Sequence, residues 1–247
     1  MKTLDLSFRE PALNLACDEV LLDEVHSGNR EPTLRFWESP SLFVVVGYGN
    51  DIERECHTQA CQKLGIPILR RSSGGGTVLQ GPGCLNYSLI LQIADNEKTG
   101  NIGTTNCRVM KTNRDALGKA LGLAVEIEGH TDLAIDGVKF SGNAQRRRRD
   151  ALLFHGTILL GFDLPMICQA LRMPSCEPDY REGRSHETFC RNIPLTPEAV
   201  KQALGRSWLC GGQAPPIDAG KVQRLAWEKY SRPDWIHRRA KHSQASE

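Results

Sequence analysis

The spacing of apolar residues changes along the chain between two periods, and each period predicts a different element. After Pro11, apolar residues recur at helical spacing as far as Val25, and Gly28 suits the end of the helix that this pattern predicts. Residues 85–93 instead place apolar side chains on one parity, which is the period of a half-buried strand. The Asp136-Gly137 pair, between two short apolar runs, predicts a tight β-hairpin.

The remaining segments follow the same two periods. Further strands are predicted at residues 33–37, 42–46, 66–70, 77–80, 133–135, 138–140 and 151–160. Further helices are predicted at residues 53–64, 106–121, 164–173, 197–208 and 217–230. Because helices surround the strands and gather toward the C-terminal end, the order predicts an α+β fold. We expect one domain over residues 1–235 and a polar, flexible tail over residues 236–247.

Composition and charge exclude several classes of protein. The formal net charge of +2 is too small for a general polyanion binder, so attraction to an acidic partner would need a local patch. The nine cysteines have scattered spacings without a C-x-x-C pair, which argues against zinc and thioredoxin-like sites. The first residues carry no signal-peptide pattern, and the longest apolar run, Leu42–Gly47, is too short to span a bilayer. We therefore expect a cytoplasmic protein with reduced thiols and no membrane segment.

The most informative stretch of the chain is residues 70–78, with the sequence RRSSGGGTV. Three successive glycines allow positive φ angles and a close approach of the backbone to a ligand, and their amides can surround an anion. Arg70 and Arg71 add donors suited to a phosphate or a carboxylate. A flexible turn between two strands is the simpler interpretation, and it stays open for the loop taken alone. Neither the P-loop pattern nor the dinucleotide-binding Gly-x-Gly-x-x-Gly pattern occurs here.

Three motifs, in the same order, resemble those of lipoate–protein ligases. They are residues 70–78 followed by 83–88 (GCLNYS), residues 131–133 (TDL) with 139–145 (KFSGNAQ), and residues 155–160 (HGTILL). The resemblance implies the core shared by biotin ligases and class II tRNA synthetases, a mixed β-sheet backed by helices. It also implies ATP and Mg²⁺ as cofactors, lipoate or octanoate as the acyl substrate, and a lipoyl-domain protein as the acceptor.

The resemblance also implies a set of residues that bind substrate or nucleotide, without a protein ligand for a metal. These residues are Arg70, Arg71, Ser73, Gly74, Gly75, Gly76, Thr77, Val78, Asn86, Asp132, Ser141, Gly142, Ala144, His155, Gly156 and Thr157.

Lys139 is the candidate catalytic residue. A solvated surface lysine is the simpler interpretation, since most lysines are exposed. Here, however, the small residues at 141–144 leave room for a ligand beside it, and the resemblance makes it the invariant lysine of these ligases. Its ammonium would oppose the negative charge that develops on the α-phosphate and on the attacked carbonyl in both half-reactions.

Related octanoyltransferases pass the acyl group through a cysteine thioester, and this chain lacks a cysteine at both positions that those enzymes use. Leu152 occupies the position three residues before the His-Gly pair, and residues 131–138 contain no cysteine. Gly76 also stands where one transferase class has arginine. The resemblance therefore favours an ATP-dependent ligase that forms an acyl-adenylate. A transferase acting without ATP stays open, because Gln80–Gly83 resembles a transferase motif and Cys84 follows it.

Three further features have several interpretations. His155 is either a hydrogen-bonded core histidine or, as the resemblance implies, a residue that shapes the acyl pocket. Arg146–Arg149 is typical of a solvated charge run, and a role in guiding an acidic lipoyl domain stays open. No aromatic residues interleave with this run, so we expect no nucleic-acid partner. Residues 172–192 combine charge with glycine, and we expect a loop that closes on substrate.

The segment after Leu160 is too short for the C-terminal accessory domain of larger family members. A separate accessory-domain protein therefore stays open as a partner. A catalytically inactive lipoate-binding protein is the non-enzyme alternative. Biotin ranks last among the acyl substrates, because the Gly-Arg-Gly-Arg loop of biotin ligases is absent. Pyrophosphate release that depends on ATP would separate a ligase from both alternatives, and a trapped acyl-cysteine would identify a transferase.

Overall fold

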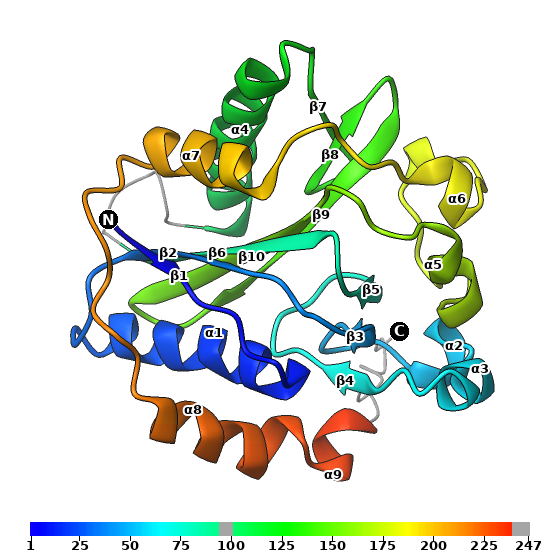
Figure 1. The fold of residues 1–247 in the computed structure, drawn as a ribbon, viewed down its shortest axis with the longest axis horizontal. Helices are drawn as coiled ribbons and strands as arrows, with labels where there is room; N and C mark the ends of the chain where they lie inside the picture. Colours follow the sequence, from blue (N-terminus) through cyan, green and yellow to red (C-terminus); the bar gives the residue numbers. More distant parts are fainter. Residues whose placement is uncertain (94–100, 239–247) are drawn as a thin grey trace, which may run out of the picture.

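The computed structural model describes residues 1–93 and 101–238, and its centre is a seven-stranded mixed sheet (Figure 1). The strand order is β1-β2-β6-β10-β9-β8-β7, and neighbours are antiparallel except for the parallel pair β1-β2. The strands are β1 Lys2–Asp5, β2 Thr33–Trp37, β6 Cys84–Gln92, β7 Glu126–Glu128, β8 Asp132–Ile135, β9 Val138–Arg147 and β10 Ala151–Leu159. A three-stranded sheet, ordered β4-β3-β5, completes the strands. It consists of β3 Phe43–Val46, β4 Ile68–Arg70 and β5 Val78–Gln80.

Helices cover both faces of the large sheet (Figure 1). One face packs against α1 Pro11–His26, which is covered in turn by α8 Ala219–Leu225 and the π-helical turn η2 Ala226–Tyr230. The other face packs against α4 Ile102–Leu121 and α7 Pro197–Ser207. The short helices are α2 Ile52–Glu55, α3 Thr58–Lys63, α5 Pro165–Ala170, η1 Asp179–Arg181, α6 His186–Phe189 and α9 Pro233–Ile236. A mixed sheet backed by helices confirms the predicted α+β class.

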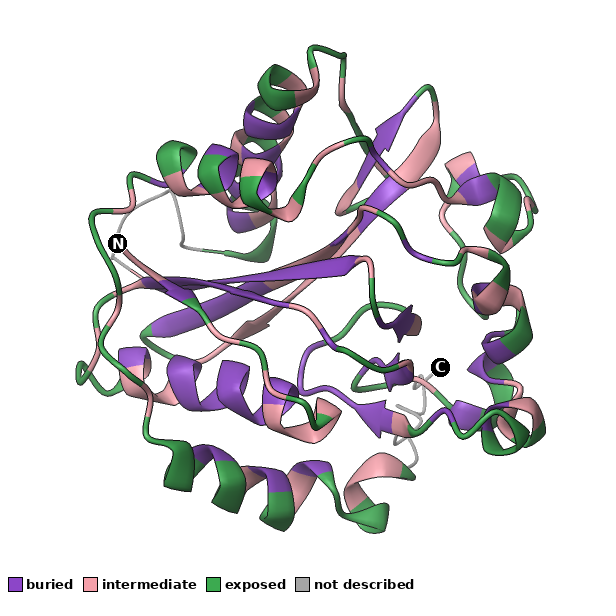
Figure 2. Cartoon of the chain, in the orientation of Figure 1, coloured by how far each residue is buried: buried purple, intermediate pink, exposed green. Residues whose placement is uncertain are grey.

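The two faces of the large sheet have separate apolar cores. On β10, Phe154 packs toward α4, whereas its neighbour Leu153 packs toward α1, because successive strand residues point to opposite faces. Buried residues therefore concentrate in the central strands, along most of α1, which lies between the sheet and α8, and on one side of α4 (Figure 2). Each fully buried leucine or phenylalanine contributes about 1.5–3 kcal/mol to folding. The central strands are thus a rigid base for the side chains at their ends.

Polar caps define the ends of the helices on the α4 side. Helix α4 begins earlier than predicted, because the Asn101 side chain accepts a hydrogen bond from the Thr104 amide (2.9 Å) and closes a capping box. It ends at Gly122, whose φ of 68° is left-handed. The predicted cap of α7 is confirmed, since Thr196 Oγ1 accepts from the Ala199 amide (3.2 Å).

Two predicted helices are wrong in extent for a shared reason. The segment 53–64 divides into α2 and α3, and the segment 164–173 shortens to α5. Cys56 and Leu171 are both extended and form an antiparallel bridge to each other. Backbone pairing between distant segments therefore replaces the helical hydrogen bonds that local spacing favours.

The chain termini also depart from the sequence pattern. Strands β1 and β7 were not predicted, and the last long helix, predicted at 217–230, begins at Ala219 in α8 and widens into the π-helical turn η2. The predicted tail begins in ordered structure, because Ile236 ends α9 and the Arg238 guanidinium lies 3.9 Å from the centroid of the Tyr48 ring. Residues 239–247 of that tail lie outside the described residues. Within residues 1–93 and 101–238, no helix has the length and apolarity needed to cross a bilayer.

Candidate functional site

The hairpin that carries Lys139 forms as predicted. Asp136 (φ 53°) and Gly137 (φ 68°) both have positive φ, as the favoured two-residue hairpin turn requires. This turn joins β8 to β9 at the end of the sheet nearest α6, and the two strands pair in antiparallel register. Lys139 is the second residue of β9, so the turn determines where its side chain leaves the sheet.

Beyond the turn, the pairing of β8 with β9 slips by one residue. Ala134 pairs with Lys139, whereas Leu133 pairs with Ser141, so Phe140 has no residue opposite it. This is a β-bulge, which bends a strand and re-aims its side chains. Phe140 and Ser141 are both buried, with Phe140 in the core on the α4 side.

The bulge decides which face of the sheet Lys139 occupies. Strict alternation would place it with Ser141 and Asn143, but its ammonium lies instead over Gly142. A Cβ atom on Gly142 would approach Lys139 Nζ to 2.8 Å and Cε to 2.9 Å. Glycine at this position therefore leaves the space that the lysine stem fills. Ala144 and His155, which pair across β9 and β10, lie further along the sheet.

Asp132 holds the Lys139 ammonium. Lys139 Nζ lies 2.8 Å from Asp132 Oδ1, and the two side chains are 25% and 14% exposed. The second carboxylate oxygen, Oδ2, accepts a hydrogen bond from Tyr180 Oη at 2.8 Å. The ammonium therefore remains in contact with solvent while its position is fixed. Asp132 was a predicted site residue, and the structure brings it to Lys139; Tyr180 was not predicted.

The glycine loop lies against the strand that carries Lys139. A Cβ atom on Gly75, which has a φ of 81°, would come within 3.0 Å of Arg71 Nη2 and 3.3 Å of Ala144 Cβ. Arg71 is buried and donates to the carbonyl oxygens of Gly74 and Gly76. Burial lowers the pKa of Arg71 to about 10, and no carboxylate of the described residues pairs with it. A buried cation without a counter-charge is costly, so this loop favours an anion.

Arg70 is occupied differently from Arg71. Its Nη1 donates to the carbonyls of Gly47 and Asn50 (2.8 Å each), and its Nε donates to the carbonyl of Ile236 (2.8 Å). Burial is the main cause that lowers the pKa of Arg70. Arg70 therefore joins the loop after β3 to α9, and Arg71 is the arginine that borders the glycine carbonyls.

His155 links the glycine loop to α1 through a chain of hydrogen bonds. Its Nε2 lies 2.6 Å from Ser73 Oγ, and its Nδ1 lies 3.5 Å from Asp18 Oδ2. Asp18 Oδ1 in turn accepts from Arg35 Nη1 at 2.6 Å. Although burial acts to raise the pKa of Asp18, the charge of Arg35 and the hydrogen bond from His155 lower it below 3.8. The ionised carboxylate orients the imidazole toward Ser73.

Asn86 and Thr157 form a polar triangle with Gln80. Thr157 Oγ1 donates to Asn86 Oδ1 (2.7 Å) and accepts from Gln80 Nε2 (2.5 Å), and Asn86 Nδ2 donates to Gln80 Oε1 (3.0 Å). Thr77 precedes β5, and Val78 and Gln80 are the first and last residues of that strand. The triangle joins the small sheet to β6 and β10, so these predicted site residues brace the loop.

The glycine of the His-Gly pair has a packing explanation. A Cβ atom on Gly156 would lie 1.7 Å from Asn143 Oδ1, so a side chain there would displace the amide. Asn143 accepts from Tyr87 Oη (2.5 Å) and donates to the carbonyl of Thr131 (2.7 Å). Tyr87 accepts in turn from Asn113 in α4 (2.8 Å). Asn143 therefore ties the lysine strand to the core and to the start of β8.

Several residues of the site escaped sequence reasoning. Asp18 carried a usable signal, because it is a carboxylate among the apolar positions of a predicted helix. Cys190 carried none: it forms a parallel bridge with Lys139 from a distant part of the chain. Burial raises the pKa of Cys190, and the charges of Lys139 and Arg181 offset part of that rise.

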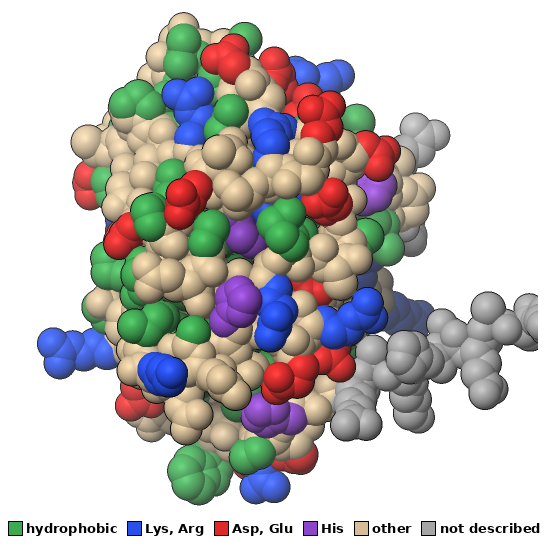
Figure 3. Space-filling model, turned by 90° about the vertical axis from the view of Figure 1, so that its right-hand side faces the viewer, with side chains coloured by type: hydrophobic (Ala, Val, Ile, Leu, Met, Phe, Trp, Pro, Cys, Tyr) green, Lys and Arg blue, Asp and Glu red, His purple; other side chains and the backbone are tan. Residues whose placement is uncertain are grey.

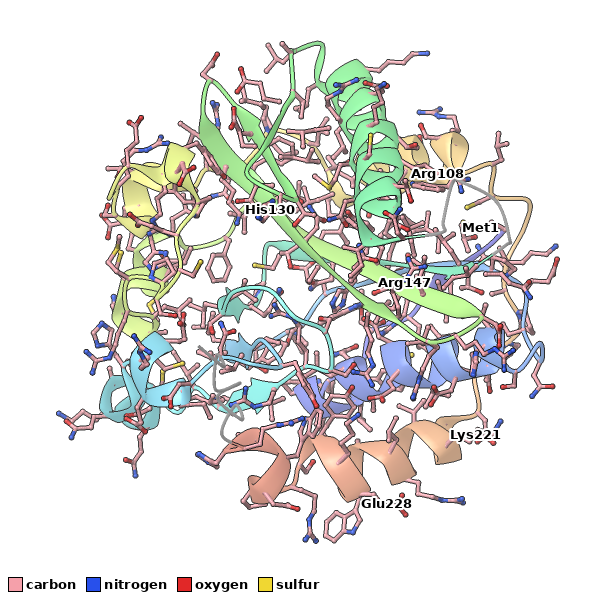
Figure 4. All side chains as sticks on the ribbon, turned by 180° about the vertical axis from the view of Figure 1, so that it is seen from behind. Met1, Arg108, His130, Arg147, Lys221 and Glu228 are labelled. Atoms are coloured by element: carbon pink, nitrogen blue, oxygen red, sulfur yellow. The ribbon has the colours of Figure 1, made fainter. Side chains whose placement is uncertain are left out.

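The Arg146–Arg149 run is not a free basic patch. Arg146 donates to the carbonyl of Ser72 beside the glycine loop (2.7 Å), Arg147 (Figure 4) donates to a threonine of α4, and Arg148 pairs with a carboxylate of α1. Of the four, Arg149 is largely exposed, at 91%. Figure 3 shows acidic and basic side chains interspersed on the face it displays. Arg146, Arg147 and Arg148 therefore contribute mainly to contacts within the protein, and Arg149 presents most of its side chain to solvent.

The fold and site define an α+β protein in which a glycine-rich loop lies against β9, an inner strand of the mixed sheet that carries a lysine near its first residue. Residues 10–204 match the model of the lipoyl protein ligase A/B catalytic domain, and the chain belongs to this family. It is 31% identical over 163 residues to the "Probable lipoate-protein ligase A" of Mycoplasma pneumoniae, a match that covers 66% of this chain and 46% of that protein. It is 29% identical over 260 residues to the octanoyltransferase LipM of Carboxydothermus hydrogenoformans, covering 92% and 94% of the two chains.

Solved structures share the fold. A lipoate-protein ligase A bound with ATP superposes with a TM-score of 0.80 at 23% identity, covering 96% of this chain and 98% of that one. A bi-partite lipoate protein ligase of Thermoplasma acidophilum, solved in a study that includes its E2 lipoyl domain, superposes with a TM-score of 0.77 at 23% identity, covering 96% and 95%. The predicted family and its fold are therefore confirmed.

Proposed function

We propose that this chain is an ATP-dependent lipoate–protein ligase that activates lipoate or octanoate as the acyl-adenylate and transfers the acyl group to a lysine of a lipoyl domain. The observation that carries the proposal is the position of the Lys139 ammonium. It lies on the same strand as Ala144, which contacts the anion loop, and its partner Asp132 leaves it part exposed. The Lys139 ammonium and the buried Arg71 guanidinium are thus two cationic groups beside the same stretch of β9.

In the first half-reaction, the acid's carboxylate oxygen attacks the α-phosphorus of ATP, and pyrophosphate leaves. Charge grows on the phosphate, and Lys139 would oppose it from the sheet while the glycine-loop amides and Arg71 oppose it from the loop. In the second half-reaction, the acceptor amine attacks the acyl carbonyl and AMP leaves. The same ammonium would then stabilise the tetrahedral intermediate. Both groups are held by the protein, Lys139 by Asp132 and Arg71 by the loop carbonyls, so their cost of reorganisation is small.

Nucleotide binding is supported by the chemistry of the loop, and metal binding by the chain alone is not. Gly75 has positive φ and Arg71 lacks a carboxylate partner within the described residues, which suits a phosphate. No group of three His, Cys, Asp or Glu side chains in residues 1–93 and 101–238 is placed to hold a metal ion. Magnesium, if it accompanies ATP, would therefore take most of its ligands from phosphate and water and would neutralise phosphate charge.

A lipoyl domain is the proposed acceptor. The Thermoplasma acidophilum ligase, which resembles this chain in fold, is described as bi-partite and was studied with its E2 lipoyl domain. By analogy, a separate accessory protein is a second proposed partner. Adding such a protein would raise the rate of adenylation by this chain if it is one part of a two-part enzyme.

An acyltransferase that works through a cysteine is the second candidate function. The LipM relative matches nearly the whole of both chains, and Cys190 forms a bridge with Lys139. Transfer through Cys190 would form a thioester with release of the donor thiol, followed by attack of the acceptor amine. Cys84, the cysteine that the sequence raised, suits this role poorly, because it is fully buried and burial raises the pKa of its thiol far above the ordinary range.

One experiment separates the two functions. An apo lipoyl domain is incubated with the protein and either lipoate plus MgATP, or octanoyl acyl carrier protein without nucleotide, and its mass is measured. We expect modification with lipoate and MgATP, accompanied by pyrophosphate. Equal modification from the acyl carrier protein without nucleotide, abolished by Cys190→Ala, would reject the ligase and establish the transferase. Cys84→Ala is the matched control, and it should keep turnover within a few-fold.

A further inference from the structure

The segment from Pro178 to Arg191 lies on the lysine hairpin and holds it at several points. Arg184 Nη1 donates to the carbonyl of Gly137 at the hairpin turn (3.0 Å). The amide of Arg191 donates to the carbonyl of Lys139 (2.8 Å). At the other end, a Cβ atom on Gly129 would lie 3.3 Å from Pro178, so the segment also lies against the turn that joins β7 to β8. We call residues 178–191 the strap.

Within the strap, Tyr180 reaches the Lys139 site directly. Its hydroxyl donates to Asp132 Oδ2 at 2.8 Å, while Lys139 Nζ lies 2.8 Å from Asp132 Oδ1. Each oxygen of one carboxylate therefore has its own donor, one from the hairpin and one from the strap. Burial and the neighbouring Asp132 raise the pKa of Tyr180 far above its ordinary value, so the hydroxyl stays protonated and remains a donor.

Tyr180 is itself held in place. Its ring lies 5.1 Å from that of Phe189, which is buried, and its carbonyl accepts from Arg184. Three cationic groups surround the Phe189 ring: Arg181 at 4.6 Å, Arg184 at 5.3 Å and Lys139 at 5.9 Å. The phenol therefore cannot follow the carboxylate if the carboxylate turns. It acts as a fixed point outside the hairpin.

A carboxylate that accepts from a single donor can still rotate about its last side-chain torsion, whereas a carboxylate that accepts from two donors is held in one orientation. The last torsion of an aspartate side chain is broad and two-fold, so it is poorly fixed by rotamer preference alone. The ammonium of Lys139 is mobile too, since it ends a flexible four-carbon stem. If both groups were free to turn, the position of the cation would spread. The Tyr180 hydroxyl, an immobile second donor, removes this freedom.

We propose that Tyr180 is a positioning residue: its hydroxyl fixes the Asp132 carboxylate, and the fixed carboxylate holds the Lys139 ammonium over Gly142. The proposal deepens the proposed function, because it rests on Lys139 being the cation that meets the phosphate. The positioning role of Tyr180 also assigns a function to the strap. Residues 178–191 set the geometry of the lysine from outside the sheet, and Arg184 and Arg191 attach the strap to the hairpin.

Tyr180→Phe tests the proposal by removing one oxygen and keeping the ring against Phe189. We expect kcat for pyrophosphate release to fall about ten-fold, the scale of one hydrogen bond to a charged group. KM for ATP and for the acid should stay within two-fold, because the proposal gives the phenol no contact with either substrate. A merely structural residue would instead lower the melting temperature and leave kcat per folded molecule unchanged.

Tyr230→Phe is a matched control. Tyr230 Oη donates to the Glu19 carboxylate, which also binds a lysine, Lys229, at a distance from the hairpin. The control removes the same hydroxyl–carboxylate bond and should cost stability without a change in kcat. A ten-fold loss of kcat in both variants would reject a specific role for Tyr180.

A second measurement does not depend on turnover. Acetic anhydride at low dose, followed by mass spectrometry, reports how accessible the Lys139 amine is in the protein without substrates. We expect more labelling of Lys139 in Asp132→Asn than in the wild type, an intermediate level in Tyr180→Phe and the wild-type level in Tyr230→Phe. Unchanged labelling in a folded Tyr180→Phe protein would overturn the proposal. If this order holds but the wild type releases no pyrophosphate, the ligase function fails while the positioning role stands.

Discussion

Two clusters in this molecule contain the same three kinds of side chain, a lysine, a carboxylate and a tyrosine, and they differ in how fully the carboxylate is occupied. In the hairpin cluster, Asp132 receives one ammonium and one hydroxyl. In the helix cluster, Glu19 of α1 receives both contacts of Lys229 (2.6 and 2.8 Å) and the hydroxyl of Tyr230 (2.5 Å). Arg148 approaches the same carboxylate at 3.7 Å.

This difference in occupancy distinguishes the two clusters. The helix cluster joins secondary-structure elements to each other, whereas the hairpin cluster is open to a ligand. Glu19 is 5% exposed and its donors are in excess, so the helix cluster fixes η2 to α1. Although burial acts to raise the pKa of Glu19, the hydrogen bonds from Lys229 and Tyr230 lower it below 4.5. Asp132 and Lys139 are 14% and 25% exposed. Lys229 is itself 21% exposed, so the two lysines differ less in exposure than in contacts: Lys229 binds both oxygens of Glu19, whereas Lys139 contacts one oxygen of Asp132. An anion can therefore compete more readily for Lys139 than for Lys229.

The sharpest test of this comparison exchanges the two lysines for alanine. Lys139→Ala should lower adenylation and acyl transfer by about 10²–10³-fold, the loss typical of one preorganised charge, with a melting temperature near that of the wild type. Arginine at this position should rescue poorly, because its planar fork replaces a compact charge. Lys229→Ala should keep activity within two-fold and lose stability. If Lys139→Ala keeps near-normal ligation from ATP and from preformed adenylate, the site is misplaced.

Substitution of the two carboxylates, Glu19 and Asp132, should lower the free energy of unfolding by different amounts. Glu19→Gln leaves Lys229 beside a neutral amide in a mostly buried site, and we expect a loss of about 2–3 kcal/mol, somewhat below the cost of breaking a fully buried pair. Asp132→Asn breaks a part-exposed pair and should cost about 1 kcal/mol or less. Urea unfolding monitored by tryptophan fluorescence measures both. Equal losses would show that the two clusters are equally structural.

Acid should weaken the helix side of the molecule first. The pKa values of Asp18 and Glu19 lie below 3.8 and 4.5 in the folded protein. A lowered pKa contributes stability that is present above the unfolded value and is lost as pH falls through the folded value. Unfolding free energy should therefore hold above about pH 4.5 and decline below it. Glu19→Gln should flatten this decline, and an unchanged slope would show that Glu19 is not part of the acid response.

Much of the fold could be predicted because its elements follow local periods. The Asp136-Gly137 turn, β6 and β10 were found from local spacing, whereas β9, predicted only at residues 138–140, continues to Arg147. The helix predicted at 53–64 failed because Cys56 pairs with Leu171, a contact that no local window contains. Long-range backbone pairing of this kind overrides propensity.

The candidate site was predicted in part for a related reason. Motifs identified Lys139 and the glycine loop, but period-two reasoning places Lys139 with Ser141, and only the bulge at Phe140 turns it toward Gly142. Tyr180 was missed because its role depends on a contact with a residue far away in the sequence.

The smallest expected effects concern the arginine run, of which Arg148 approaches the carboxylate of the helix cluster. Arg148 Nη2 lies 2.8 Å from Asp23 and 3.7 Å from Glu19, and its side chain is 35% exposed. Arg148→Ala should therefore cost only about 0.2–1 kcal/mol of stability, the range of exposed ion pairs.

Arg149, which is 91% exposed and lies 3.8 Å from its neighbour Asp150, should tolerate Arg149→Glu without a measurable loss of stability. Acceptor modification at low and high salt then decides what the run does. If the run guided a lipoyl domain, Arg149→Glu would slow modification more at low salt, because screening weakens steering between exposed charges. We expect the salt dependence of Arg149→Glu to match the wild type, since the other three arginines are bound to the protein itself.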